Sequence, residues 1–230
     1  MAAFFLYGKQ PTIVFTSGVV ESLNELNSSV KSLSEGADIS ANELVCTGKG
    51  SRIEATSSGL NWRVGSSSIV RFDSEYDIFV HSGSVLVTTN KNNIKLRFSS
   101  RLSSATFSGS GTIIIEALEN GGFKFIPLEA DGSLNTPSNE TKKVIGGQLL
   151  LVIGKPGKLG SAYDIDIMLL LQSSKLVNYF PSLLPTIDQI GLAIYVQQLK
   201  LKGKYDALIG DAKTENNLQI WGFGPNPKKD

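Results

Sequence analysis

The residues best able to do covalent or acid–base chemistry are a single cysteine and a single histidine, Cys46 and His81. They could form a thiol–imidazole pair, in which the imidazole activates the thiol as a nucleophile. Cys46, however, ends the apolar run Leu44–Cys46, which is typical of a small buried side chain. His81 borders a turn and has no specific partner in the sequence. We therefore expect neither residue to be catalytic.

Because the chain has only one cysteine and one histidine, the disulfides and metal sites that it could form are also limited. One cysteine excludes a disulfide within the chain and a multi-cysteine metal cluster, and one histidine excludes a two-histidine metal site. Asp73, Glu75 and Asp77 alternate and could hold calcium on a turn, but the terminal glutamate of an EF-hand loop is missing. We interpret them as a solvated acidic edge that discourages pairing between sheets. The sequence predicts no metal or other cofactor.

Two glycine-rich segments resemble phosphate-binding loops only superficially. Gly109–Thr112 lacks the lysine of a P-loop, and β-branched residues follow it in place of a helix, which favours the start of a strand. In Gly154–Gly160 a proline removes one backbone donor, and we interpret this segment as a linker.

Aromatic side chains provide the remaining candidate site. Trp62, Tyr76 and Trp221 could stack against sugar rings if they were exposed together, although most such residues in β domains fill cores. Three coplanar exposed rings would favour a sugar ligand, whereas exposed β edges and apolar patches would favour a protein partner.

The composition is that of a folded globular chain. Of 230 residues, 41% are hydrophobic, and 22 basic against 21 acidic residues give a net charge of +1. This balance lacks the basic excess of a surface for nucleic acid or anionic membranes. No apolar run approaches the roughly 20 residues that span a bilayer, so we expect no transmembrane segment. No targeting signal is legible in Met1–Leu6.

Short apolar or alternating runs separated by Gly, Ser, Asn and Asp extend from Thr12 to Ile153. In Leu60–Val64 and Ile94–Phe98 alternate residues would face opposite sides of a sheet. The spacing predicts a mainly β fold of short antiparallel strands, arranged as a β-sandwich or β-roll. Glu21–Gly36 is the weakest stretch, and its Ser and Asn content indicates a loop or a partly helical insertion.

Two C-terminal helices are predicted after the β region. The first lies in Tyr163–Ser174 with Asp164 as its cap. The second covers Thr186–Lys202, where Thr186 and Gln189 have capping-box spacing. Its apolar stripe consists of Ile187, Ile190, Ile194 and Leu201. We expect this stripe to dock on the β unit. The predicted division of the chain is therefore a β domain (12–153), a helical extension packed on it (154–210) and a tail (211–230).

The order of the β segments resembles the FecR domain. Its "TG-x-x-S" strand corresponds to Thr47–Ser51, its "lG-x-x-S-x-v" strand to Val64–Val70, its "GT-x-x-x-v" strand to Gly111–Glu116, and its "GGQ" strand to Gly146–Gln148. The resemblance covers roughly Thr12–Ile153. Membrane regulators of this family carry an anti-sigma helix bundle and a transmembrane segment before the domain. Neither is found in these residues, so we expect the stand-alone kind.

The resemblance implies an extracytoplasmic, non-enzymatic β module that binds proteins or envelope components, in the periplasm or outside the cell. The family has no catalytic motif that could be transferred to this chain. The alternative hypothesis is a carbohydrate-binding β module of the envelope that uses Trp62, Tyr76 or Trp221. A nucleic-acid partner is not expected.

Overall fold

The protein is mainly β, as the sequence predicts, and 15 of its described strands form one continuous sheet that curls into two layers. The computed structural model describes residues 10–41, 43–201, 205–208 and 220–223. Almost all neighbouring strands are antiparallel, but β8 and β9 run parallel. The first layer contains β1 (Thr12–Ser17), β5 (Arg52–Ser57), β6 (Leu60–Val64), β11 (Phe123–Pro127), β14 (Gln148–Ile153) and β15 (Lys158–Asp164). The second contains β2 (Val20–Asn24), β3 (Val30–Ser32), β4 (Glu43–Thr47), β7 (Ile69–Ser74), β8 (Asp77–Ser82), β12 (Asp131–Asn135) and β13 (Thr141–Val144).

Two long strands, β9 (Ser84–Ser99) and β10 (Ser104–Ala117), run through both layers. The start of β9 pairs with β6 and its end with β8, while β10 pairs first with β12 and then with β11. The strands bend near Asn93, whose φ is +57°, and at a register shift between Gly109 and Gly111. A Cβ on Gly109 would lie 2.1 Å from the Asp131 carbonyl oxygen. The glycines of Gly109–Thr112 therefore permit a close backbone contact inside a strand, and the strand begins earlier than expected.

The core between the two layers is apolar and rich in aromatic rings. Trp62 and Phe72 meet edge to face with ring centroids 5.4 Å apart, and Phe125 contacts both Phe98 and Phe107. All five side chains have 0% exposure. Alternation explains this: Leu60, Trp62 and Val64 of β6 enter the core, and the residues between them face the opposite side of the layer.

Two segments expected to be irregular contain strand residues beside turns. Glu21–Gly36 contains β2 and β3, because β2 pairs with β4 over five residues and buries Ser22 at 1% exposure. Gly154–Gly160 contains the start of β15, which pairs with β14. Serine and glycine weaken the apolar pattern in both segments, so pairing with a neighbouring strand decides their conformation.

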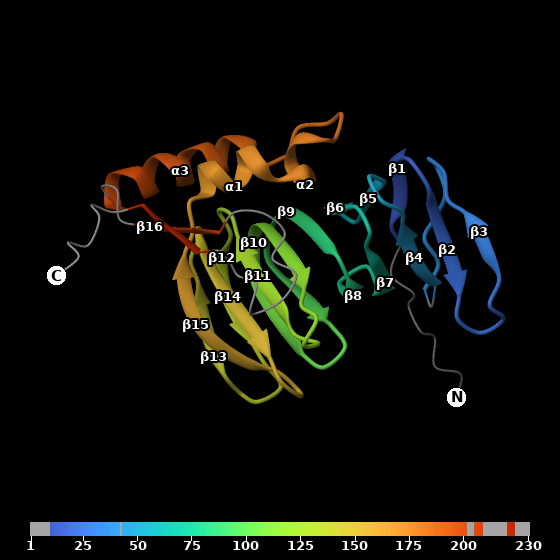
Figure 1. Cartoon of the computed structure of the whole chain (residues 1–230), viewed down its shortest axis with the longest axis horizontal. Helices are drawn as coiled ribbons and strands as arrows, with labels where there is room; N and C mark the ends of the chain where they lie inside the picture. Colours follow the sequence, from blue (N-terminus) through green and yellow to red (C-terminus); the bar gives the residue numbers. More distant parts are fainter. Residues whose placement is uncertain (1–9, 42, 202–204, 209–219, 224–230) are drawn as a thin grey trace.

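Helices α1 (Ile167–Ser173), α2 (Lys175–Asn178) and α3 (Ile187–Leu201) cover the outer side of the first layer (Figure 1). The cap of α1 is Asp166, whose carboxylate accepts a hydrogen bond from the Leu169 N–H, and not Asp164, which ends β15. Among the described residues, the Thr186 hydroxyl bonds to the Thr112 hydroxyl, and no bond joins it to the Gln189 N–H as a capping box would. That side chain ties the start of α3 to β10.

A second apolar cluster joins these helices to the sheet. Ile190 of α3 has 0% exposure and packs in the same cluster as Ile114 of β10 and Ile126 of β11. Ile187 and Ile194 are half-buried. The division of the chain at residues 153 and 154 stays a prediction, as does the tail; Leu201 lies in α3, but its side chain is outside the described part. A hairpin of β16 (Tyr205–Leu208) and β17 (Ile220–Phe223) follows α3.

A buried arginine fastens the segment between α2 and α3 to the sheet. Arg63 of β6 has a fully buried side chain, and its Nε lies 3.2 Å from Glu54 Oε1. The guanidinium also donates to the carbonyl oxygens of Leu176 and Ser182, and its carbon lies 4.6 Å from the Phe180 ring centroid. Burial lowers the pKa of Arg63, and the charge of Glu54 offsets part of that effect. This cluster, the Arg63 latch, satisfies carbonyl groups that a short helix leaves open.

Candidate interaction surface

Helix α3 has two apolar faces, of which only one is covered by the sheet. Ile190 lies on the covered face. On the other face four large side chains remain exposed at 37–63%: Leu192, Tyr195, Val196 and Leu199. Their spacing of i, i+3, i+4 and i+7 places them in one stripe along the helix. We call these four residues the outer stripe.

Two adjoining hollows, of about 510 and 590 Å³, lie between α3 and the region of β12 and β13. Both are lined by Ala193 and Val196 of the helix and by Glu129 and Asp131 of the sheet side. We call the two together the α3 groove. Carboxylates dominate its charge, because Asp164 also lines it and Lys143 is the one basic side chain among the described lining residues. The groove is therefore apolar along the helix and acidic along the sheet.

Glu129 lines this groove, and both of its carboxylate oxygens are buried. Burial raises the pKa of Glu129, and the nearby Thr112 and Thr186 hydroxyls offset part of this rise. Those two hydroxyls bond to each other, and Thr112 also lies 3.2 Å from the Thr88 hydroxyl. Glu129 therefore contributes a poorly solvated carboxyl group beside the N-terminus of α3.

Of the three predicted aromatic residues, the structure describes the side chains of Trp62 and Tyr76. Trp62 is in the inter-layer core, where its indole N–H has no partner among the described residues. It cannot stack against a surface sugar in this conformation, because it occupies an inward position of β6. Tyr76 is half-buried against the same core. Trp221 is in β17, and its side chain lies outside the described residues.

Cys46 and His81 lie on β4 and β8, and β7 runs between these two strands. Strands are spaced roughly 4.8 Å apart, so the residues are separated by about twice that distance. Cys46 is half-buried, and burial followed by the Glu21 charge raises the pKa of its thiol. His81 is exposed and contacts the Phe79 ring. The structure therefore does not bring the two together as a nucleophile and base.

The three alternating carboxylates are at the β7–β8 hairpin, and not at a sheet edge. Both strands have a partner on each side. Asp73 accepts a hydrogen bond from Arg71, and Asp77 accepts one from Arg97. Among the described residues no group of three or more metal-ligating side chains comes together. Asp73 and Asp77 therefore belong to arginine pairs in this fold.

Sequence reasoning missed the outer stripe, although its signal is legible. The predicted apolar stripe consists mainly of isoleucines of α3. Leu192 and Leu199, which are seven residues apart, belong to a second stripe that this prediction does not include. The Arg63 latch and Glu129 have no comparable local signal, because their partners are distant in the sequence. No described helix has the length and apolar character needed to cross a membrane.

Comparisons with known proteins provide no family for this chain. No family model matches it, and no curated protein matches its sequence. Among solved structures, it is similar to a putative anti-sigma factor from Parabacteroides distasonis, with 8% sequence identity and a TM-score of 0.44. The similarity covers 55% of this chain and 62% of that one, so less than two thirds of that protein is matched. A likeness at this level assigns neither family nor function.

Proposed function

We propose that this protein is a non-catalytic β module that binds another protein through the outer stripe and the α3 groove. The observation that carries the proposal is the outer stripe itself. Single exposed apolar residues are ordinary, but four at helical spacing on a docked helix form a contiguous patch. Such patches commonly receive an amphipathic partner segment.

The charge of the groove indicates the chemistry of the partner. Asp131 and Asp164 would face whatever enters, with Lys143 as the opposing charge. We therefore infer a partner helix that has an apolar face and carries at least one Lys or Arg beside it. A second copy of this chain fits less well, because its own acidic groove residues would approach these carboxylates.

The FecR resemblance supports the same class of function. It implies a protein-binding module of the cell envelope, in the periplasm or outside the cell. The separation of Cys46 from His81 supports a role without catalysis. Location, export and the identity of the partner belong to this proposal.

The test uses site-specific photo-crosslinking, followed by affinity measurement with the purified partner. A photoreactive residue at position 192 or 199 should yield a discrete protein adduct in envelope extract. The matched control is Leu26, which is 88% exposed on the β2–β3 turn. Binding of the purified partner should weaken at least about tenfold in Leu192→Asp and Leu199→Asp, because each buries a charge against an apolar surface. Leu26→Asp should bind normally.

Three outcomes would contradict the proposal. One is identical adducts from positions 26, 192 and 199. Another is partner affinity that does not change in Leu192→Asp, checked against an unchanged melting temperature. A third is sedimentation showing a dimer of this chain that Leu192→Asp dissociates, which would assign the stripe to self-association.

A further inference from the structure

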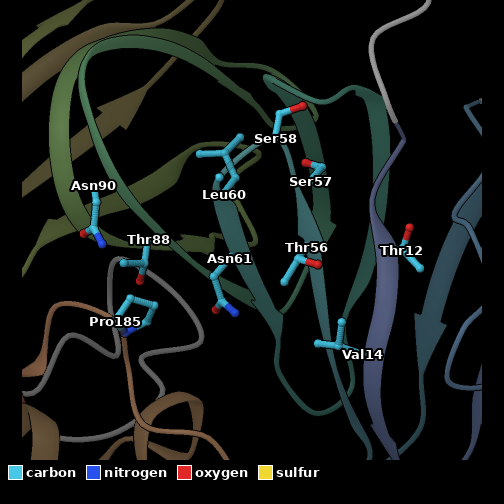
Figure 2. Close-up of a pocket in the computed structure, with 11 residues that line it drawn as sticks. Thr12, Val14, Thr56, Ser57, Ser58, Leu60, Asn61, Thr88, Asn90 and Pro185 are labelled. Atoms are coloured by element: carbon cyan, nitrogen blue, oxygen red, sulfur yellow. The ribbon is translucent and has the colours of Figure 1, made fainter.

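A second polar surface lies on the same side of the first layer, beyond the segment that leads into α3. Strand register places Thr12 opposite Thr56, Thr56 opposite Asn61, and Asn61 opposite Thr88. Four small polar side chains therefore cross four adjacent strands in one row, which we call the polar row. Figure 2 shows Thr56, Asn61 and Thr88 on successive strands, with Pro185 beside Thr88. At roughly 4.8 Å per strand, the row extends about 14 Å.

A hollow of about 510 Å³ lies over this row. Its described lining consists of hydroxyl, amide and apolar groups, and none of these residues is charged. Asn90 adds a second amide, while Val14, at 47% exposure, and Pro185 add apolar contacts. The hollow therefore differs in character from the acidic α3 groove.

One polar atom beside the hollow lacks a hydrogen-bond partner among the described residues. Ser57 lies opposite Leu60 and faces the inter-layer core, so its hydroxyl does not belong to the polar row. Asn61 Oδ1 is buried without a partner. The orientation of this amide is set by its Nδ2, which donates to Glu54 Oε1 over 2.7 Å. Asn61 Oδ1 is therefore an acceptor, and buried polar groups are normally paired.

We propose that this hollow binds a neutral oligosaccharide. Sugar hydroxyls both donate and accept, so they can serve the Asn61 oxygen and the Thr56 hydroxyl together. The uncharged lining selects a neutral chain, and Val14 can contact the apolar C–H face of a sugar ring.

The position of the row on a sheet face argues against a peptide bound as an added strand. Strand addition requires a free edge, whereas β5 and β6 have neighbours on both sides. On the outer edge of β1, the Ile13 N–H already donates to the Ala37 carbonyl oxygen. The proposal does not use Trp62, Tyr76 or Trp221, and it is independent of the protein partner of α3.

The experiment is a calorimetric and NMR titration of the full chain with defined probes. These are hexamers of β-1,4-glucose, α-1,4-glucose and β-1,4-N-acetylglucosamine, with hexagalacturonate as the charged comparator. At least one neutral hexamer should bind at millimolar concentration and shift the amide signals of Thr56 and Asn61. Hexagalacturonate should not bind.

Conservative variants locate the site. Thr56→Val should weaken binding about fivefold, the change expected for one neutral hydrogen bond. Thr106→Val is the matched control, because Thr106 is half-buried on β10 in the other layer. Leu192→Asp should leave sugar binding unchanged, which separates this site from the α3 groove. Absence of binding by all three neutral hexamers, or equal binding by Thr56→Val and wild type, would overturn the proposal.

Discussion

The two packed interfaces of this protein differ in how they are held together. Between the sheet layers, the core consists of aliphatic and aromatic side chains such as Trp62 and Phe107. Between the first layer and the helices, an apolar cluster around Ile190 is combined with a buried charge pair, Arg63–Glu54. The stability of an apolar interface depends on how completely its side chains fill the available volume. The stability of a mixed interface also depends on the pairing of its charges and therefore on pH.

The largest expected effect comes from breaking the Arg63 latch. Arg63→Met should lower the free energy of unfolding by about 3–5 kcal/mol, because it leaves the Glu54 carboxylate buried without its cation. Urea denaturation monitored by circular dichroism measures this loss.

A second substitution sharpens the contrast between the interfaces. Adding Glu54→Leu to Arg63→Met should recover part of the lost stability, because the unpaired charge is then removed. Recovery remains partial, since the Leu176 and Ser182 carbonyl groups still lack their donor. A double variant that is less stable than the single one would show that the latch does not act through charge pairing.

A smaller loss is expected in the apolar part of the same interface. Ile190→Ala should cost about 2–5 kcal/mol, because it removes a fully buried side chain between α3 and the sheet. Leu192→Ala is the matched control on the outer stripe and should change stability by no more than about 0.5 kcal/mol. Equal melting temperatures for both variants would mean that α3 does not stabilise the β unit.

The smallest effect should depend on pH and involves Glu129. Its pKa is raised in the folded protein, so the folded state binds the proton more tightly than the unfolded state. Stability should therefore fall as pH rises from the ordinary glutamate range through the raised value. Glu129→Gln lacks this fall, and its melting temperature should exceed that of wild type at neutral pH by a margin that shrinks on acidification. A margin independent of pH would contradict this assignment.

Local pattern was sufficient for most of the β region and for α3. The predicted run Leu60–Val64 coincides with β6, because alternation and turn residues are local properties. It was insufficient for β2, β3 and β15, whose Ser, Asn and Gly content conceals strand pairing. Local pattern also places the cap of α1 two residues early, because Asp164 and Asp166 are both aspartates and the pattern does not distinguish them.

The amino-acid sequence by itself determined the mainly β class, the strand rhythm and the apolar stripes of α3, since each depends on residues close in the chain. Only the tertiary structure decided which stripe is covered, because that depends on where the sheet lies. The same holds for Arg63, whose partners come from β5 and from the segment after α2. The tertiary structure also decided that Trp62 is buried. It aligned four polar residues on separate strands, because strand register joins residues that are distant in the sequence: Thr12, Thr56, Asn61 and Thr88.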